Sequence, residues 1–384
     1  MMCHRMLTRT LTPVSFMSRI VFPGRFYASR VCSFDDAKVA VSTLKQEPDN
    51  EVKLRMYGLF KQATSGDCSG DEPGTFNFVA KAKWQAWNSL KSMSKEDAAS
   101  KYIELINDLL AKEPCDPVDT AGQSALPTPG LESSVNGGVM QICLSRPEKK
   151  NAVTFDMYQS WTSMLNKAAT DPKIKIVAIT GKGDYFSSGN DLTTFTKQLE
   201  TGVPIQDIVK TARNVLYQFV SAFISFPKTL VALVNGPSVG ITVTTLGLYD
   251  FVLAAETATF HTPFVTLGQT PEGCSSATFP KIMGPLRANE MLLFNRRLTA
   301  REAYDWGLVT RVVSKTDFPG ECKKLLNEMA QLPPETLVFS KEIMRARDRE
   351  LLYSVNKMEC DRLAERWTSP ECIQAITSFL QRVK

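Results

Sequence analysis

Two glycine-rich turns follow apolar stretches, where backbone groups can do chemistry. The first, KGDYFSSGNDL at residues 182–192, comes after the apolar run Ile174–Thr180, and the second, NGPSVGI at 235–241, comes after Thr229–Val234. Such turns expose backbone N–H groups toward an anion or a carbonyl oxygen, and the second opens a helix whose first N–H groups lack partners. Taken alone, the first turn is typical of an ordinary strand-to-helix loop. Together, the two turns suggest an oxyanion hole.

The acid or base that accompanies these turns is expected to be a carboxylate. The chain has only two histidines, His4 and His261. His4 lies in an N-terminal leader, and His261 stands in an apolar setting typical of a packed structural residue. A single remaining histidine leaves little room for a Ser-His-Asp triad or a histidine-based metal site, so no metal is expected.

Earlier in the chain, two segments place lysines and aromatics on successive helical turns. They read YGLFKQAT at residues 57–64 and KAKWQAW at 81–87. An acyl-coenzyme A ligand needs cations for its phosphates, an aromatic face for its adenine and an apolar groove for its tail. The alternative is that Trp84 and Trp87 are core residues and that the lysines form a solvated face.

Several spaced motifs across residues 34–110 resemble the acyl-CoA-binding protein family. They are Pro48–Glu51, the YxxFKQAT run, Gly66-Asp67, Pro73-Gly74, the KAKWxAW run and Ser94–Asp97. The resemblance implies that the coenzyme contacts Tyr57, Lys61, Lys83 and Tyr102, with the two lysines on its phosphates. Phe60 belongs to the same predicted site, and it stands where the family often has a tyrosine hydroxyl.

Residues 135–384 resemble the crotonase (enoyl-CoA hydratase/isomerase) superfamily through the two turns, Arg146-Pro147 and Asn151-Ala152. The resemblance implies a spiral of ββα turns that assembles as a homotrimer or a hexamer through its C-terminal helices. It also implies that the oxyanion hole consists of the Asn190 and Ile241 backbone N–H groups. The implied substrate-binding residues are Ser188, Gly189, Asn190, Asp191, Leu192 and Gly240.

The carboxylates decide between the reactions of this superfamily. Hydratases hold a water with two glutamates, and the corresponding positions here are Thr244 and Phe264, neither of which is a base. In contrast, the loop LGQTPEGC at residues 267–274 places Glu272 where the 3,2-enoyl-CoA isomerases have their glutamate. Glu272 is therefore the predicted catalytic residue, and its apolar neighbours Leu267 and Phe279 are expected to raise its pKa.

The predicted reaction converts a 3-enoyl-CoA, cis or trans, into the trans-2-enoyl-CoA during oxidation of unsaturated fatty acids. One carboxylate between C2 and C4 suffices for both proton transfers, so no cofactor is expected beyond the coenzyme A of the substrate. Two alternatives remain. One is another crotonase reaction, either dienoyl-CoA isomerisation or thioester hydrolysis, and the other is a non-catalytic acyl-CoA carrier or scaffold.

The two predicted sites lie in separate parts of the chain, so two domains are expected. A length of 384 residues is enough for two domains. Helical punctuation predicts an all-α four-helix bundle over residues 34–110, with helices over 34–44, from Pro48 to near Gly66, over 76–90 and from Ser94. A linker rich in proline is predicted over 111–134. From residue 135, short apolar runs alternate with helical segments, which predicts an α/β domain with a helical C-terminal region. The predicted strands are 139–144, 174–180, 229–234, 251–255 and 308–313.

Charge, composition and the two ends of the sequence indicate where the protein is located and which partners are not expected. Residues 1–33 contain five arginines and no acid, which is typical of a mitochondrial transit peptide, although a disordered tail is the alternative. The other 40 basic residues balance 40 acidic ones, so nucleic-acid binding is not expected. No apolar run is long enough for a membrane span. Nine cysteines without a CxxC pair suit reduced thiols. The chain ends Gln-Arg-Val-Lys and not in a Ser-Lys-Leu-type peroxisomal signal, so the mitochondrial matrix is the expected location, with the peroxisome as the alternative.

Overall fold

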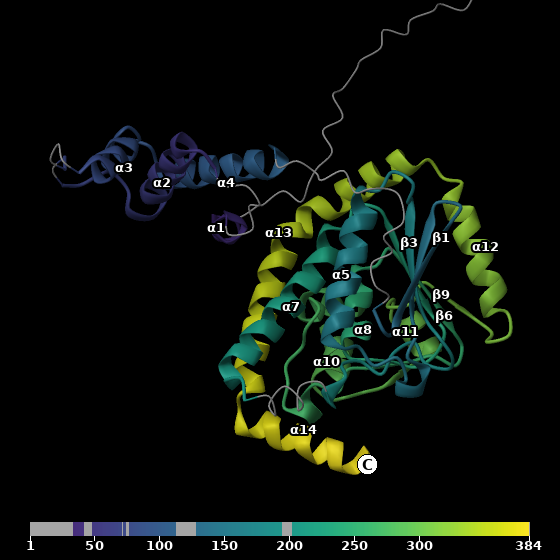
Figure 1. The fold of residues 1–384 in the computed structure, drawn as a ribbon. Helices are drawn as coiled ribbons and strands as arrows, with labels where there is room; N and C mark the ends of the chain where they lie inside the picture. Colours follow the sequence, from purple (N-terminus) through teal and green to yellow (C-terminus); the bar gives the residue numbers. More distant parts are fainter. Residues whose placement is uncertain are drawn as a thin grey trace, which may run out of the picture. The chain divides into compact units, whose positions relative to one another are not determined.

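The computed structural model describes residues 34–41, 48–70, 72–73, 77–112, 128–193 and 202–383 (Figure 1). It divides the chain into two compact units, Met1–Pro114 and Cys115–Lys384. The predicted leader, residues 1–33, lies outside the described part. Among the described residues, no helix is both long and apolar enough to cross a membrane.

The first unit is helical, as predicted. Its helices are α1 (Phe34–Val41), α2 (Asn50–Ser65), α3 (Phe78–Asn88) and α4 (Lys95–Lys112). The Asp49 side chain caps α2 by accepting the Val52 N–H at 2.8 Å, and Ser94 Oγ accepts the Asp97 N–H at 3.0 Å at the start of α4. These caps confirm the two predicted helix starts. The buried core contains Ala37, Leu59, Tyr102, Leu105 and Ile106.

The second unit is built on a six-stranded sheet in the order β1-β2-β3-β4-β6-β9. Only β1 runs antiparallel to its neighbour, and the other pairs are parallel. The strands are β1 (Leu131–Asn136), β2 (Val139–Leu144), β3 (Ile176–Gly181), β4 (Thr229–Val234), β6 (Phe251–Ala255) and β9 (Arg311–Val313). A smaller sheet joins β5 (Ser238–Val239), β7 (Thr259–His261) and β8 (Leu298–Thr299). The predicted α/β architecture is confirmed.

Helices cover both faces of the large sheet. Figure 1 shows α5 (Phe155–Thr170) and α7 (Ile205–Ser225) on one face and α12 (Phe318–Ala330) on the other. Alternate residues of β3 enter the two cores: Val177 and Ile179 pack on the α5 and α7 side, whereas Ile176 and Ala178 pack on the α12 side. The long helix α13 (Pro334–Trp367) and α14 (Pro370–Val383) complete the predicted helical C-terminal region.

Several predicted boundaries differ from the structure; the strand predicted over 174–180, for example, is β3 at Ile176–Gly181. The predicted linker ends at residue 134, but β1 already begins at Leu131. β1 is an edge strand with one buried residue and five exposed ones, so it lacks the alternation by which a strand is detected. The strand predicted over 308–313 begins only at Arg311, because Leu308 and Val309 donate their N–H groups to the Ala303 carbonyl in the turn that ends α11 (Ala300–Asp305).

Candidate active site

The two glycine-rich turns lie against each other. Val239 N donates to the Ser187 carbonyl at 3.0 Å, and a Cβ on Gly189 would stand 2.9 Å from the Val239 carbonyl oxygen. Gly189 has φ +85°, and Gly240 in the facing turn has φ +63°. Both positions use conformations that glycine adopts without strain, and at Gly189 any side chain would also collide with backbone. The two turns therefore pack together, as an oxyanion hole between them requires.

Two backbone N–H groups at this meeting point have no acceptor within the described residues, namely those of Asn190 and Ile241. Their neighbours are engaged: Asp191 N donates to the Val153 carbonyl and Gly240 N donates to the His261 carbonyl, each at 2.9 Å. Ile241 is the first residue of α8 (Ile241–Thr244), where helical N–H groups lack partners. A substrate carbonyl oxygen would supply the missing acceptor for both.

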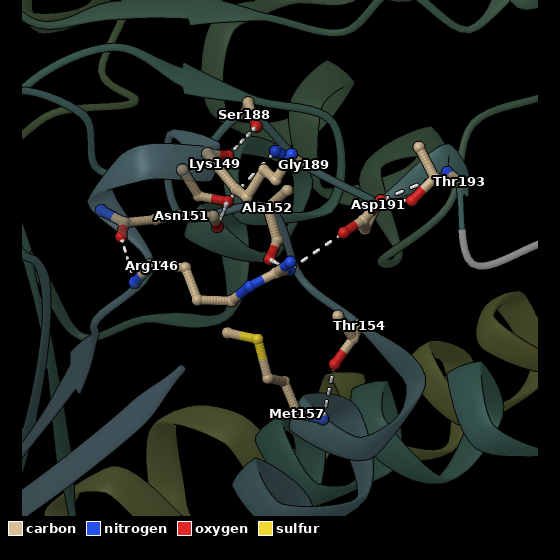
Figure 2. Close-up of polar contacts among 11 residues, drawn as sticks. Arg146, Lys149, Asn151, Ala152, Thr154, Met157, Ser188, Gly189, Asp191 and Thr193 are labelled. Atoms are coloured by element: carbon tan, nitrogen blue, oxygen red, sulfur yellow. Dashed lines mark hydrogen bonds and ion pairs between the residues drawn. The ribbon is translucent and has the colours of Figure 1, made fainter. Parts of the chain in front are cut away.

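An arginine-centred network holds the first turn in place (Figure 2). The Arg146 guanidinium donates to the Ala152 carbonyl at 2.7 Å and to Asp191 Oδ2 at 3.0 Å. Burial acts to raise the pKa of Asp191, but hydrogen bonds from Thr193 and Arg146 outweigh it and hold that pKa below its usual range. Ser188 is tied to the same region, because its N–H donates to the Lys150 carbonyl at 2.8 Å.

Asn151 links this network to the preceding loop. Its Nδ2 donates to the carbonyls of Lys182 and Tyr185, at 2.9 and 2.7 Å, and its Oδ1 accepts the Arg146 N–H at 2.9 Å. The Arg146-Pro147 and Asn151-Ala152 motifs thus carry a structural function, which is to fix the turn that presents Asn190.

Glu272 lines an apolar cavity of about 70 Å³. Its side chain is 2% exposed, and its Oε2 has no hydrogen-bond partner among the described residues. Burial, followed by the charge of Glu359, raises the pKa of Glu272 to about 8. The other lining residues are Val153, Phe155, Tyr158, Asn190, Asp191, Leu192, Ala212, Val215, Leu216, Gln269, Trp367 and Ile376. Four predicted site residues, Glu272, Asn190, Asp191 and Leu192, therefore meet at one cavity.

The predicted rise in the pKa of Glu272 is confirmed, and burial is its main cause. Leu267 and Phe279 are buried, yet neither is among the described residues that line the cavity. The apolar lining comes largely from α5, α7, α13 and α14. Leu267 and Phe279 are close to Glu272 in sequence, whereas most of the residues that enclose the cavity come from helices distant in sequence.

Sequence reasoning did not find Tyr158, which packs beside the catalytic candidates. Its hydroxyl donates to Asn190 Oδ1 and so anchors the residue whose backbone N–H has no acceptor in the described part of the chain. Burial, followed by the charge of Glu272, raises the pKa of Tyr158, so the phenol stays protonated. Its position one helical turn before the buried Trp161 gives only the signal of a core residue.

The two hydratase positions lack carboxylates and also lack space. Thr244 and Phe264 are buried, and Thr244 Oγ1 donates to the Ile241 carbonyl at 3.2 Å. A Cβ on Gly273 would lie 2.5 Å from Thr244 Oγ1, so the Glu272 loop packs directly against Thr244. Asp191, the other acid that lines the cavity, is paired with Arg146. Glu272 is thus the one unpaired carboxylate among the described lining residues.

The helical unit places its two predicted lysines over aromatic rings. Lys61 Nζ lies 4.6 Å from the centre of the Trp87 ring, and Lys83 Nζ lies 5.3 Å from that of Tyr57. Phe60 and Tyr102 pack together in the core of this unit, with ring centres 6.3 Å apart. The structure therefore places Tyr102 inside the bundle, whereas Lys61 and Lys83 with their aromatic partners form a polar surface of the type that phosphates need.

Asn190 and Glu272 line one apolar cavity, and the turn that carries Ile241 packs against the turn that carries Asn190. A carboxylate and backbone N–H groups are what an enzyme needs to remove a proton beside a carbonyl and to stabilise the resulting oxyanion. The family model for enoyl-CoA hydratase/isomerase matches residues 134–384, and that for acyl CoA binding protein matches residues 32–106. The chain belongs to the enoyl-CoA hydratase/isomerase family and carries an acyl-CoA-binding-protein domain before it.

Named relatives share both parts of the chain. It is 48% identical over 351 residues to enoyl-CoA delta isomerase 2 of Rattus norvegicus, covering 91% of this chain and 89% of that one. It is 44% identical over 313 residues to peroxisomal enoyl-CoA delta isomerase 3 of Mus musculus, covering 81% and 98%. An enoyl-CoA hydratase/isomerase structure from Pseudoalteromonas atlantica T6c matches with a TM-score of 0.60 at 32% identity, covering 66% of this chain and 97% of that one.

Proposed function

We propose that this protein is an isomerase that moves the double bond of a 3-enoyl-CoA to the trans-2 position during fatty-acid oxidation. The observation that carries the proposal is the buried carboxylate of Glu272, the one unpaired carboxylate among the described residues that line an apolar cavity, which Asn190 also lines. Relatives that match most of the chain are named enoyl-CoA delta isomerases. The isomerisation that these names state and the single carboxylate of the site both support the proposal.

The mechanism uses one carboxylate twice. Glu272 takes a proton from C2, which leaves a dienolate whose oxygen accepts the Asn190 and Ile241 N–H groups. The same carboxyl then delivers the proton to C4, and the double bond moves into conjugation with the thioester. Removing one oxyanion donor typically lowers a rate about 100- to 1,000-fold. No cofactor is needed, because the proton is returned to the substrate.

The raised pKa suits this shuttle. A carboxyl with a pKa near 8 is a stronger base than an ordinary glutamate, and once protonated it is a weak enough acid to hold the proton until C4 is in place. Because the base must be ionised in the free enzyme, kcat/KM is expected to rise with pH through about 8. The pH dependence of turnover of a purified sample measures this limb.

Turnover of a 3-enoyl-CoA by purified protein tests the proposal against its alternatives. Formation of the conjugated 2-enoyl-CoA supports isomerisation. Release of free coenzyme A would instead indicate a thioesterase, and binding without turnover would indicate a carrier. With Thr244 and Phe264 at the hydratase positions, 3-hydroxyacyl-CoA is expected only in trace amounts, and its accumulation would contradict the assignment of Glu272 as a lone base.

The helical unit is proposed to bind acyl-CoA thioesters through Lys61 and Lys83. Each ammonium lies over an aromatic ring on the bundle surface, where it can also meet a phosphate. We assign this unit the task of holding substrate near the isomerase unit, with a local concentration in the millimolar range set by the connecting segment.

Assembly as a homotrimer or hexamer is also proposed. Large apolar side chains stand exposed along α13, an unusual feature for a helix facing water. They are Phe339, Ile343, Met344, Leu351 and Met358. Light scattering on the purified protein measures the mass directly, and a monomer at micromolar concentration would exclude this assembly.

The location proposed is the mitochondrial matrix. It rests on the five arginines and the lack of acids in residues 1–33, while one relative is named as peroxisomal. A fluorescent protein carrying residues 1–35 should enter mitochondria, and a cytosolic or peroxisomal signal would contradict the proposal.

A further inference from the structure

Glu359 lies on α13 and is a buried carboxylate without a cation partner among the described residues. Its Oε2 accepts the Cys274 N–H at 2.7 Å, and its Oε1 accepts the Ser276 N–H at 2.9 Å. Both donors belong to the start of α9 (Ser275–Met283), where the N-cap residue Cys274 makes no side-chain cap bond. A helix leaves its first N–H groups without intrahelical partners. Glu359 therefore caps α9 from a position 85 residues away.

The capped segment is the one that carries Glu272. Between Glu272 and α9, Gly273 and Cys274 both adopt left-handed conformations, with φ +68° and +62°. A cysteine in that region is strained and persists only where surrounding contacts hold it. The Glu272 carbonyl closes the turn by accepting from Ser275, from its N–H at 3.2 Å and its Oγ at 2.7 Å. The backbone of Glu272 is thus joined to α9, and α9 is joined to Glu359.

We propose that Glu359 is a positioning residue for catalysis, which clamps the start of α9 and thereby places the Glu272 carboxylate in the cavity. The inference rests on the proposed isomerase function and names a residue outside the reacting atoms. Glu359 itself does not line the cavity among the described residues. Its effect on the reaction passes through the Cys274–Ser276 backbone.

The same geometry acts on the charge of Glu359. Both of its oxygens accept from N–H groups, whereas a protonated carboxyl would turn one oxygen into a donor facing a donor. Burial raises the pKa of Glu359 above its usual value, whereas the hydrogen bonds from Ser276 and Cys274 act to lower it and favour the ionised form. The negative charge of Glu359 adds to burial in raising the pKa of Glu272. Other titratable groups facing Glu272 are Cys360 on α13 and Tyr158 on α5, both protonated, and Asp191, which is paired with Arg146.

The replacement Glu359→Gln tests the clamp at nearly constant volume. Glutamine can accept from only one of the two N–H groups, and it carries no charge. We expect kcat to fall about 10- to 100-fold, the range for a catalytic group misplaced by about 1 Å, with KM within about twofold of wild type. We also expect the acid limb of kcat/KM to move to lower pH, because one cause of the raised pKa of Glu272 is removed.

A matched control is Glu302→Gln. Glu302 is also a carboxylate at the start of a helix, α11, where it accepts the Thr299 N–H at 2.8 Å, but it lines no part of the cavity. This variant should lose stability without a change in the pH profile. If Glu359→Gln fails to fold, Glu359→Asp replaces it: aspartate keeps the charge but is too short to reach both N–H groups, so kcat should fall with the acid limb unmoved.

The outcomes separate this inference from the proposed function. Wild-type protein that turns over 3-enoyl-CoA, loses activity on Glu272→Gln and keeps full kcat and an unmoved acid limb on Glu359→Gln would overturn the positioning role alone. Full kcat in Glu359→Asp would do the same. Wild-type protein without isomerase activity would remove the proposed function and, with it, the inference.

Discussion

The replacement Glu272→Gln tests the assigned base with little change in shape. Glutamine has almost the volume of glutamate but neither accepts nor releases a proton at the working pH. The Glu272 side chain is 2% exposed, and its Oε2 has no partner among the described residues, so the amide breaks no hydrogen bond at that atom. We therefore expect a folded variant whose KM is close to that of the wild type.

The expected loss of turnover is large because the carboxyl acts in both half-reactions. A positioned acid or base typically contributes about 100- to 10,000-fold to a rate, so kcat should fall by at least about 100-fold. The assay follows the absorbance of the conjugated 2-enoyl thioester at saturating 3-enoyl-CoA. A variant that keeps more than about a tenth of wild-type turnover would remove Glu272 from the mechanism.

The same variant should be more stable than the wild type at alkaline pH. The pKa of Glu272 is about 8 in the folded protein, against 4.5 for an unperturbed glutamate. The unfolded chain releases its proton first as pH rises, so this group lowers the free energy of unfolding progressively between pH 4.5 and about 8. At 1.36 kcal/mol per pKa unit, the ceiling of this cost is about 5 kcal/mol. Glutamine has no such dependence.

Thermal unfolding of both proteins between pH 5 and pH 9 measures that cost. The difference in Tm between Glu272→Gln and wild type should be small at pH 5 and should grow as pH rises. Parallel Tm curves for the two proteins would refute the burial argument for the raised pKa, even if the variant were inactive.

Three further predictions concern the backbone turn and the helical unit. Gly189→Ala should lower both kcat and Tm, since the new Cβ would lie 2.9 Å from the Val239 carbonyl oxygen, whereas Gly202→Ala, at φ +76° with open space, should lower Tm through backbone strain alone and leave kcat unchanged. Lys61→Ala and Lys83→Ala should each weaken acyl-CoA binding by about 1.5 to 3 kcal/mol in calorimetry, with Lys101→Ala as the control; unchanged affinity would exclude these lysines. Deleting residues 34–110 should leave kcat almost unchanged and slow turnover only at low substrate, and a collapse of kcat would refute the holding role.

The elements that local sequence signals define were predictable. The capping box at Thr299 and Glu302 is present as both of its hydrogen bonds, and the strands at 139–144, 229–234 and 251–255 match residue for residue. The edge strand β1 was missed because a strand with five exposed residues has no hydrophobic alternation. Local chemistry thus predicts caps and buried strands but not an edge strand whose main stabilisation is backbone pairing with β2.

The site residues were predictable only where a short local sequence defines their backbone geometry. The turns that present Asn190 and Ile241 each lie within a few residues of a strand end, so glycine spacing reveals them. Tyr158, Trp367 and Ile376 reach the same cavity from α5, α13 and α14, and nothing in their spacing distinguishes them from core residues. Their role depends on tertiary packing, which brings together residues more than 200 positions apart.

The pair of buried carboxylates explains how one glutamate becomes a base of unusual strength. Two neighbouring carboxyls in a region of low dielectric cannot both ionise without a large cost in free energy, so one of them ionises before the other. Glu359 ionises first because two backbone N–H groups point at its oxygens, whereas Glu272 Oε2 faces no donor among the described residues. The hydrogen bonds that cap α9 therefore also contribute to the proton affinity of Glu272, for which burial is the larger cause. A change at the helix cap should alter the place and the basicity of the catalytic group together.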